Sequence, residues 1–106
     1  MNISDRYREL TDEVRRLSMT PLKDSGEILT KAWQIVDRAA QELEELEETV
    51  GDIPQLQLEA KLTPVLLKSH SLLDRARMLL EEQGAEDQAA IVWELEQRIY
   101  RLLNAL

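Results

Sequence analysis

The chain has 106 residues, no cysteine, and 21 acidic against 13 basic side chains, which gives a formal net charge of −8 at neutral pH. This length allows one compact domain, so residues 1–106 form a single predicted domain, and the missing cysteines exclude disulfides, thiolate metal sites and cysteine nucleophiles. The negative charge disfavours direct binding of nucleic acid, and because no 18 apolar residues run together we expect a cytoplasmic protein without a membrane-spanning segment.

Apolar residues recur at alternating spacings of four and three in four successive segments. This spacing places an apolar stripe along one face of an α-helix, and a helix with such a stripe buries it against other helices. Short connections make consecutive helices antiparallel neighbours, so the sequence predicts an all-α, up-down antiparallel four-helix bundle. The stripes consist of Ile3, Tyr7, Leu10, Val14 and Leu17; Leu29, Ala32, Val36, Ala39, Leu43, Leu46 and Val50; Leu62, Leu66, Ser69, Leu73, Ala76 and Leu80; and Val92, Leu95, Ile99, Leu102 and Leu106.

The first predicted helix runs from about Ser4 to Met19, with Ser4 as its N-cap. The stretch around Pro21 interrupts the helical pattern, because a proline disfavours helix at the residue before it. We place the cap of the second helix at Asp24 or Ser25. A start at residue 20, with the proline at the first helical position, is the alternative.

The second and third predicted helices form a long central hairpin. The second continues to about Val50, and Gly51 is placed to end it in a left-handed conformation. Asp52 caps the third helix, and Gly84 closes it. The apolar pattern stays in phase across Pro64, so we expect one helix with a kink there. Two adjacent apolar rows on the third helix predict that it touches neighbours on two sides and is central.

The fourth predicted helix starts around residues 86–87 and continues to the C-terminus. Its Trp93 lies just beside the apolar stripe, as Trp33 does on the second helix. Such tryptophans either pack at the edge of the bundle core or serve as amphipathic anchors of an interface. Tyr100 and Leu103 extend the apolar surface of the fourth helix. We therefore predict Trp33, Trp93, Tyr100 and Leu103 as contact residues, and expect the chain to self-associate as a dimer.

Glutamates are densest near the end of the second helix, where the helix dipole opposes negative charge. The first and fourth helices bring four arginines to the same end of an antiparallel bundle, so we expect an acidic–basic cluster there. These glutamates have two interpretations. They form a solvated acidic face, or they contact a basic partner protein. For the second, the predicted contact residues are Glu44, Glu45 and Glu48. The arginines are Arg6, Arg8, Arg98 and Arg101.

Catalysis by these carboxylates would require a facing acidic pair. The all-α nucleotide hydrolases hold Mg²⁺ between two helices with such pairs, and the third helix offers only Asp74 at a matching level. His70 has no second ligand or orienting carboxylate at helical spacing. We therefore predict no metal, no cofactor and no catalytic residue.

The sequence thus favours a non-enzymatic acidic interaction module: an adaptor, regulator or assembly subunit that binds a protein partner. A small helical subunit of a nucleic-acid-processing complex is the alternative, and a continuous arginine row on the exposed face of the first helix would favour it. A Mg²⁺-dependent all-α nucleotide hydrolase is the third and least favoured hypothesis.

Overall fold

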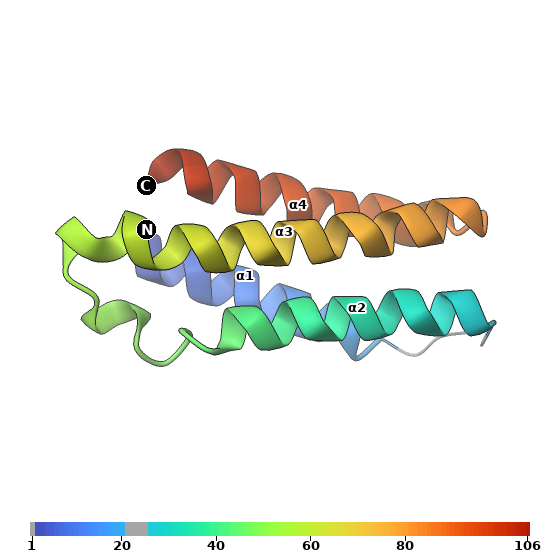
Figure 1. Ribbon diagram of the computed structural model, residues 1–106, viewed down its shortest axis with the longest axis horizontal. Helices are drawn as coiled ribbons and strands as arrows, with labels where there is room; N and C mark the ends of the chain where they lie inside the picture. The colour runs from blue at the N-terminus through green and yellow to red at the C-terminus, as the bar shows by residue number, and fades with distance from the viewer. Residues whose placement is uncertain (1, 21–25) are drawn as a thin grey trace.

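The computed structural model describes residues 2–20 and 26–106, and over these residues the chain is entirely α-helical apart from turns and connections (Figure 1). The predicted all-α four-helix architecture is confirmed. The helices are α1 (Ile3–Ser18), α2 (Glu27–Glu44), α3 (Leu58–Glu82) and α4 (Glu86–Ala105), and two short 3₁₀ turns, η1 (Val50–Asp52) and η2 (Gln55–Gln57), lie between α2 and α3. Within the described ranges, no helix combines the length and the hydropathy that a membrane crossing requires.

Consecutive helices run antiparallel, and the two chain ends lie at the same end of the bundle (Figure 1). Helix α3 shares its most extensive interfaces with α2 and α4, which confirms its predicted central position. The interface between α1 and α4 is the smallest of the four that close the bundle. The bundle is therefore tightly joined on three sides and more open on the fourth.

The core is aliphatic and follows the predicted stripes. Leu10, Val14, Leu43, Leu73 and Ile99 are almost fully withdrawn from solvent, and together with their neighbours they form one continuous cluster. Among the described residues, every buried side-chain nitrogen and oxygen has a hydrogen-bond partner. Burial of this apolar surface is the dominant stabilising contribution in such a bundle.

The N-cap of the first helix lies two residues earlier than predicted. Asn2, not Ser4, is the N-cap, and its side-chain oxygen accepts a hydrogen bond from the backbone N–H of Asp5 at 2.8 Å. The Ser4 hydroxyl instead donates to the Val50 carbonyl, at 3.4 Å. The predicted caps Asp24 and Ser25 lie outside the described residues, and α2 follows a Gly26 N-cap that supplies no side-chain bond.

Helix α2 ends at Glu44, six residues before the predicted end at Val50, and Gly51 does not adopt a left-handed conformation. Tyr7 of α1 provides a physical reason: its hydroxyl donates to the Leu43 carbonyl oxygen, which the Glu47 N–H would bind in a continued α-helix, and the Glu47 N–H donates to the Glu44 carbonyl oxygen instead. A carbonyl bound in this way from outside needs no further turn of helix to satisfy it. The acidic side chains after Glu44 also oppose extension of the helix toward its negative end.

The start of α3 also differs from the prediction, because Asp52 belongs to the 3₁₀ turn η1 and the N-cap is Gln57. Helix α3 then continues unbroken through Pro64, as one helix rather than two. The carbonyl that Pro64 cannot bind belongs to Ala60, an exposed residue, so water can satisfy it. The predicted kink at Pro64 stays a prediction.

Gly84 ends α3 as predicted. Its φ of +73° is the left-handed conformation that glycine adopts without strain. The backbone N–H of Ala85 donates back to the Leu80 carbonyl oxygen at 2.9 Å, which satisfies a carbonyl in the last turn. This sharp turn directs α4 back along α3.

Tyr7 connects α1 to the last turn of α2. Its side chain is fully buried, and its hydroxyl donates to the Leu43 carbonyl oxygen at 2.6 Å. Burial, reinforced by the nearby Glu47 and Glu45 carboxylates, raises the pKa of the Tyr7 phenol well above its ordinary value. The phenol is therefore neutral at physiological pH and acts as a hydrogen-bond donor.

We expect Tyr7→Phe to lower the free energy of unfolding by about 1 kcal/mol, because it removes one buried hydrogen bond and leaves the packing of the ring intact. Urea denaturation followed by circular dichroism measures this difference. The matched control is Tyr100→Phe, whose hydroxyl lies on an exposed residue and whose loss should leave stability unchanged. Equal effects of the two substitutions would contradict the role assigned to Tyr7.

Candidate functional site

The chain's four aromatic side chains divide evenly between core and surface. Tyr7 and Trp33 are buried, and the Trp33 indole N–H donates to the Thr20 carbonyl oxygen at 3.1 Å. Trp33 therefore packs in the core, and it exposes only 7% of its surface. Trp93 and Tyr100, both on α4, are 47% and 57% exposed. Of the predicted contact residues, these two are the ones with aromatic surface available to a partner.

Trp93 and Tyr100 lie on the same side of α4, because seven residues make almost two full turns. Glu96 lies between them in the same row, three residues after Trp93 and four before Tyr100. This row borders α3: an open groove of about 530 Å³ beside Trp93 is lined by Glu81 of α3 and by Glu86, Ala89 and Ala90 of α4. We call the surface formed by Trp93, Glu96 and Tyr100 of α4 with His70, Asp74 and Arg77 of α3 the α3–α4 face.

Glu96 is the buried charged centre of this face, with only 3% of its side chain exposed. Arg77 donates from Nε to the Glu96 Oε2 at 3.1 Å. The same guanidinium donates to Asp74 at 2.6 Å and to Glu81 at 2.7 Å, so one cation serves three carboxyl groups. The His70 Nε2 lies 3.8 Å from the Glu96 Oε1. The structure thus provides the carboxylate that the sequence around His70 lacks.

Burial raises the pKa of Glu96 to about 7, and the neighbouring Asp74 carboxyl group contributes in the same direction. Arg77 opposes these two effects only in part. The pKa of Asp74 itself is lowered, chiefly by its hydrogen bond with Arg77. The α3–α4 face therefore contains a carboxyl group that changes its charge near neutral pH.

Sequence reasoning missed Glu96. The available signal was its position, four residues after Val92 and three before Ile99, where a charged residue falls on the edge of an apolar stripe. Leu103, the remaining predicted contact residue of α4, is partly buried and packs against the core. It contributes less exposed surface than Trp93 and Tyr100.

The predicted acidic–basic cluster at the end of α2 forms in part, with a different set of arginines. Arg8 reaches the Glu47 and Glu48 carbonyls, and Arg15, which was not predicted, pairs with Glu44 and with Asp37. These two carboxylates raise the pKa of Arg15. Arg98 instead pairs with Glu13 of α1 and lies 3.9 Å from Glu9.

Glu45 and Glu48 are the predicted contact glutamates that remain exposed. Glu44 is held by Arg15, and the neighbouring Glu42 binds Lys68 of α3 at 2.8 Å. Burial and the nearby Asp12 raise the pKa of Glu47. Glu42 and Glu44 therefore form ion pairs within the bundle. The carboxylates of Glu45 and Glu48 face solvent and are available to a partner.

Across the described parts of the chain, no group of three or more acidic or histidine side chains is arranged to hold a metal ion. In comparisons with protein-family models, curated proteins and solved structures, nothing matches this chain.

The raised pKa of Glu96 predicts a pH-dependent stability. The unfolded chain releases this proton near pH 4.5 and the folded chain near pH 7, so the folded state holds more protons between these values. The contribution of Glu96 to the free energy of unfolding is therefore fully present below pH 4.5, and it is lost as the pH rises through 7. We expect a loss of about 2 to 3 kcal/mol between pH 5 and pH 8, at about 1.4 kcal/mol per pKa unit.

Glu96→Gln, which is neutral at every pH, should remove most of this decline and leave only the part that the raised pKa of Glu47 contributes. Urea denaturation at several pH values measures the difference. Glu94→Gln is the matched control, because Glu94 is an exposed glutamate on the same helix. The control should keep the decline of the natural chain. A decline of undiminished size in Glu96→Gln would show that another group is responsible.

Proposed function

We propose that the chain is a non-enzymatic, acidic helical interaction module that binds a protein partner through the α3–α4 face. The observation that carries this proposal is the exposure of Trp93 and Tyr100 in one row of α4. Large aromatic side chains contribute most of their stabilisation when they are buried, and they are enriched among the dominant residues of interfaces. Half of the chain's aromatic residues are thus placed where only another molecule could bury them.

The charges around this row define the chemistry of the partner. Glu81 of α3 and Glu86 of α4 line the groove beside Trp93. Two alanines, Ala89 and Ala90, contribute apolar surface to its lining. A basic amphipathic helix fits this surface, because its apolar side chains would cover Trp93 and its lysines or arginines would meet the glutamates.

Glu45 and Glu48 support a second contact with the same kind of partner. Both are exposed beyond the end of α2, and neither forms an ion pair with another described residue. A long basic partner that reached them would gain charge complementarity. Their contribution should be small, because exposed ion pairs add little stability and are screened by salt.

The two alternative functions are less well supported. The outermost row of α1 is formed by Asp5, Glu9, Asp12 and Arg16, so it is not the continuous arginine row that a subunit of a nucleic-acid-processing complex would favour. A Mg²⁺-dependent hydrolase would need a cation site between facing carboxylates. Where α3 and α4 bring carboxyl groups together, the Arg77 guanidinium fills the position between them.

Affinity capture from an extract of the native cell tests the proposal. We expect a partner that the natural chain retains and that Trp93→Ala with Tyr100→Ala loses. The matched control is Ile91→Ala, which removes an equally exposed apolar side chain on the other side of α4 and should retain the partner. Retention by all three proteins, or loss by all variants, would contradict binding through the α3–α4 face.

Self-association through the same face is the other prediction, and ionic strength separates it from binding of a basic partner. Two copies of the α3–α4 face would oppose glutamates to glutamates, so salt should strengthen a dimer by screening their repulsion. Salt should weaken a complex with a basic partner. Light scattering at high micromolar concentration, in low and in high salt, measures the dimer. A strict monomer in both would rule out self-association.

A further inference from the structure

The second notable surface of the bundle is a cleft between the start of α1 and the end of α4, on its more open side. The cleft has a volume of about 320 Å³ and is lined by three arginines, one glutamate and two leucines. We call it the arginine cleft. Its lining residues are Arg6, Glu9 and Leu10 of α1 and Arg98, Arg101 and Leu102 of α4.

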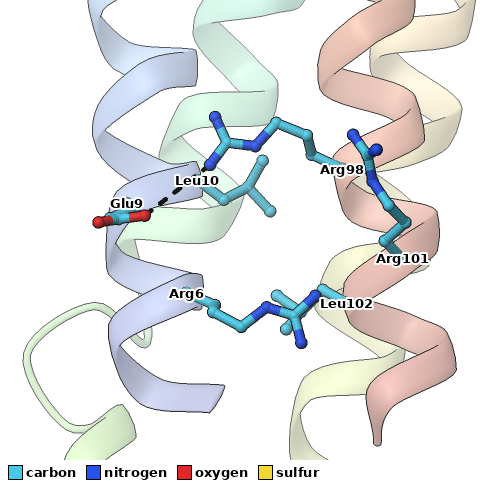
Figure 2. Close-up of a pocket in the computed structure, with 6 residues that line it drawn as sticks. All are labelled: Arg6, Glu9, Leu10, Arg98, Arg101 and Leu102. Carbon is cyan, nitrogen blue, oxygen red and sulfur yellow. Dashed lines mark ion pairs between the residues drawn. The ribbon is translucent and has the colours of Figure 1, made fainter. Parts of the chain in front are cut away.

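Figure 2 shows the three guanidinium groups arranged around the hollow, with the two leucines behind them. Leu10 and Leu102 each expose only 2% of their surface, so they close the base of the cleft against the core. The arginines therefore line a concave site of defined depth. Such a site accepts a small molecule, and its volume lies at the lower end of the range typical of ligand pockets.

The arginine cleft is positively charged, whereas the chain as a whole is negatively charged. The protein carries a net charge of −8, yet three arginines against one glutamate give the lining a formal charge of +2. Glu13 lies outside the lining but pairs with Arg98, which reduces the local charge to +1. The positive charge that remains belongs to Arg6 and Arg101, which form no ion pair and donate no side-chain hydrogen bond among the described residues.

The contrast between the paired Arg98 and the unpaired Arg6 and Arg101 indicates how a ligand would bind. Glu9 and Glu13 fix the position of Arg98, so the orientation of one guanidinium is set before any ligand arrives. Arg6 and Arg101 come from different helices, and their donors form no hydrogen bond with another described side chain (Figure 2). An anion in the cleft would be attracted by both guanidinium groups and would neutralise positive charge that the protein itself leaves unbalanced.

We propose that the arginine cleft binds the phosphate group of a small molecule. A guanidinium offers planar pairs of N–H donors that match the oxygens of phosphate, and a doubly charged anion balances two unpaired arginines. The concave shape and the small volume favour a compact tetrahedral group over an extended acidic peptide. Because Arg98 and Tyr100 lie on nearly opposite sides of α4, this site is independent of the α3–α4 face.

Titration of the ¹⁵N-labelled full chain with inorganic phosphate and with glycerol phosphate, in a phosphate-free buffer of low ionic strength, tests the proposal by NMR. We expect saturable binding in the millimolar range or tighter, with the largest shifts at residues 6–10 and 98–102. Stronger binding of glycerol phosphate would identify a phosphate monoester as the preferred source, and equal or stronger binding of inorganic phosphate would identify the free ion. Either result supports the site.

Arg101→Ala and Arg6→Ala should each weaken phosphate binding by roughly tenfold or more, the loss expected for a charge-assisted hydrogen bond. Arg75→Ala makes the same change in net charge at an exposed position on α3 and should leave binding unchanged. Circular dichroism confirms the fold of each variant. Equal weakening by all three, absence of saturation, or preferential binding of polyglutamate at the cleft would overturn the proposal.

Discussion

The structure depends on α3 being buried on two sides. Its apolar rows pack against α2 on one side and α4 on the other, and the hairpin that α3 forms with each of them makes the body of the bundle. Helix α1 completes the core through Tyr7, Leu10 and Val14 but shares little surface with α4. This asymmetry leaves one side of the bundle open, and it places the arginine cleft there.

Helix α4 contributes residues to both proposed binding sites, because its three sides differ in chemistry. One stripe is aliphatic and is buried in the core. The side that borders α3 carries Trp93 and Tyr100 among acidic residues, and the side that borders α1 carries Arg98 and Arg101. A single helix thus presents an aromatic, acidic surface and a basic surface on nearly opposite sides. We propose that a partner protein covers the first surface and that the second binds a small anion.

The helical architecture could be predicted from the sequence because the period of apolar residues is a local property. The stripes identified most of the buried residues of the four helices, and Gly84 identified the turn after α3. The ends of the central hairpin could not be predicted in the same way. Helix α2 stops at Glu44, where Tyr7, 36 residues before Leu43 in the sequence, donates to the carbonyl oxygen that the Glu47 N–H would use in a continued helix.

The candidate sites depend even more on contacts between distant segments. Glu96 is buried because Arg77 and His70 of the preceding helix cover it, and no spacing within α4 predicts those partners. The arginine cleft joins Arg6 to residues more than 90 positions later. Trp33 and Trp93 have similar positions beside their stripes, yet one is buried and the other exposed. The sequence indicated both tryptophans as candidates but could not predict which of them is buried and which is exposed.

The fluorescence of the two tryptophans tests the fold and the proposed interface most directly, because Trp33 reports on the core and Trp93 on the α3–α4 face. In dilute solution, Trp93→Phe leaves Trp33 as the only indole, and Trp33→Phe leaves Trp93. The structure predicts blue-shifted emission and weak acrylamide quenching for the first variant, and red-shifted emission and strong quenching for the second. Equal quenching of the two variants, or stronger quenching of Trp33, would contradict both the packing of the bundle and the exposure of the α3–α4 face.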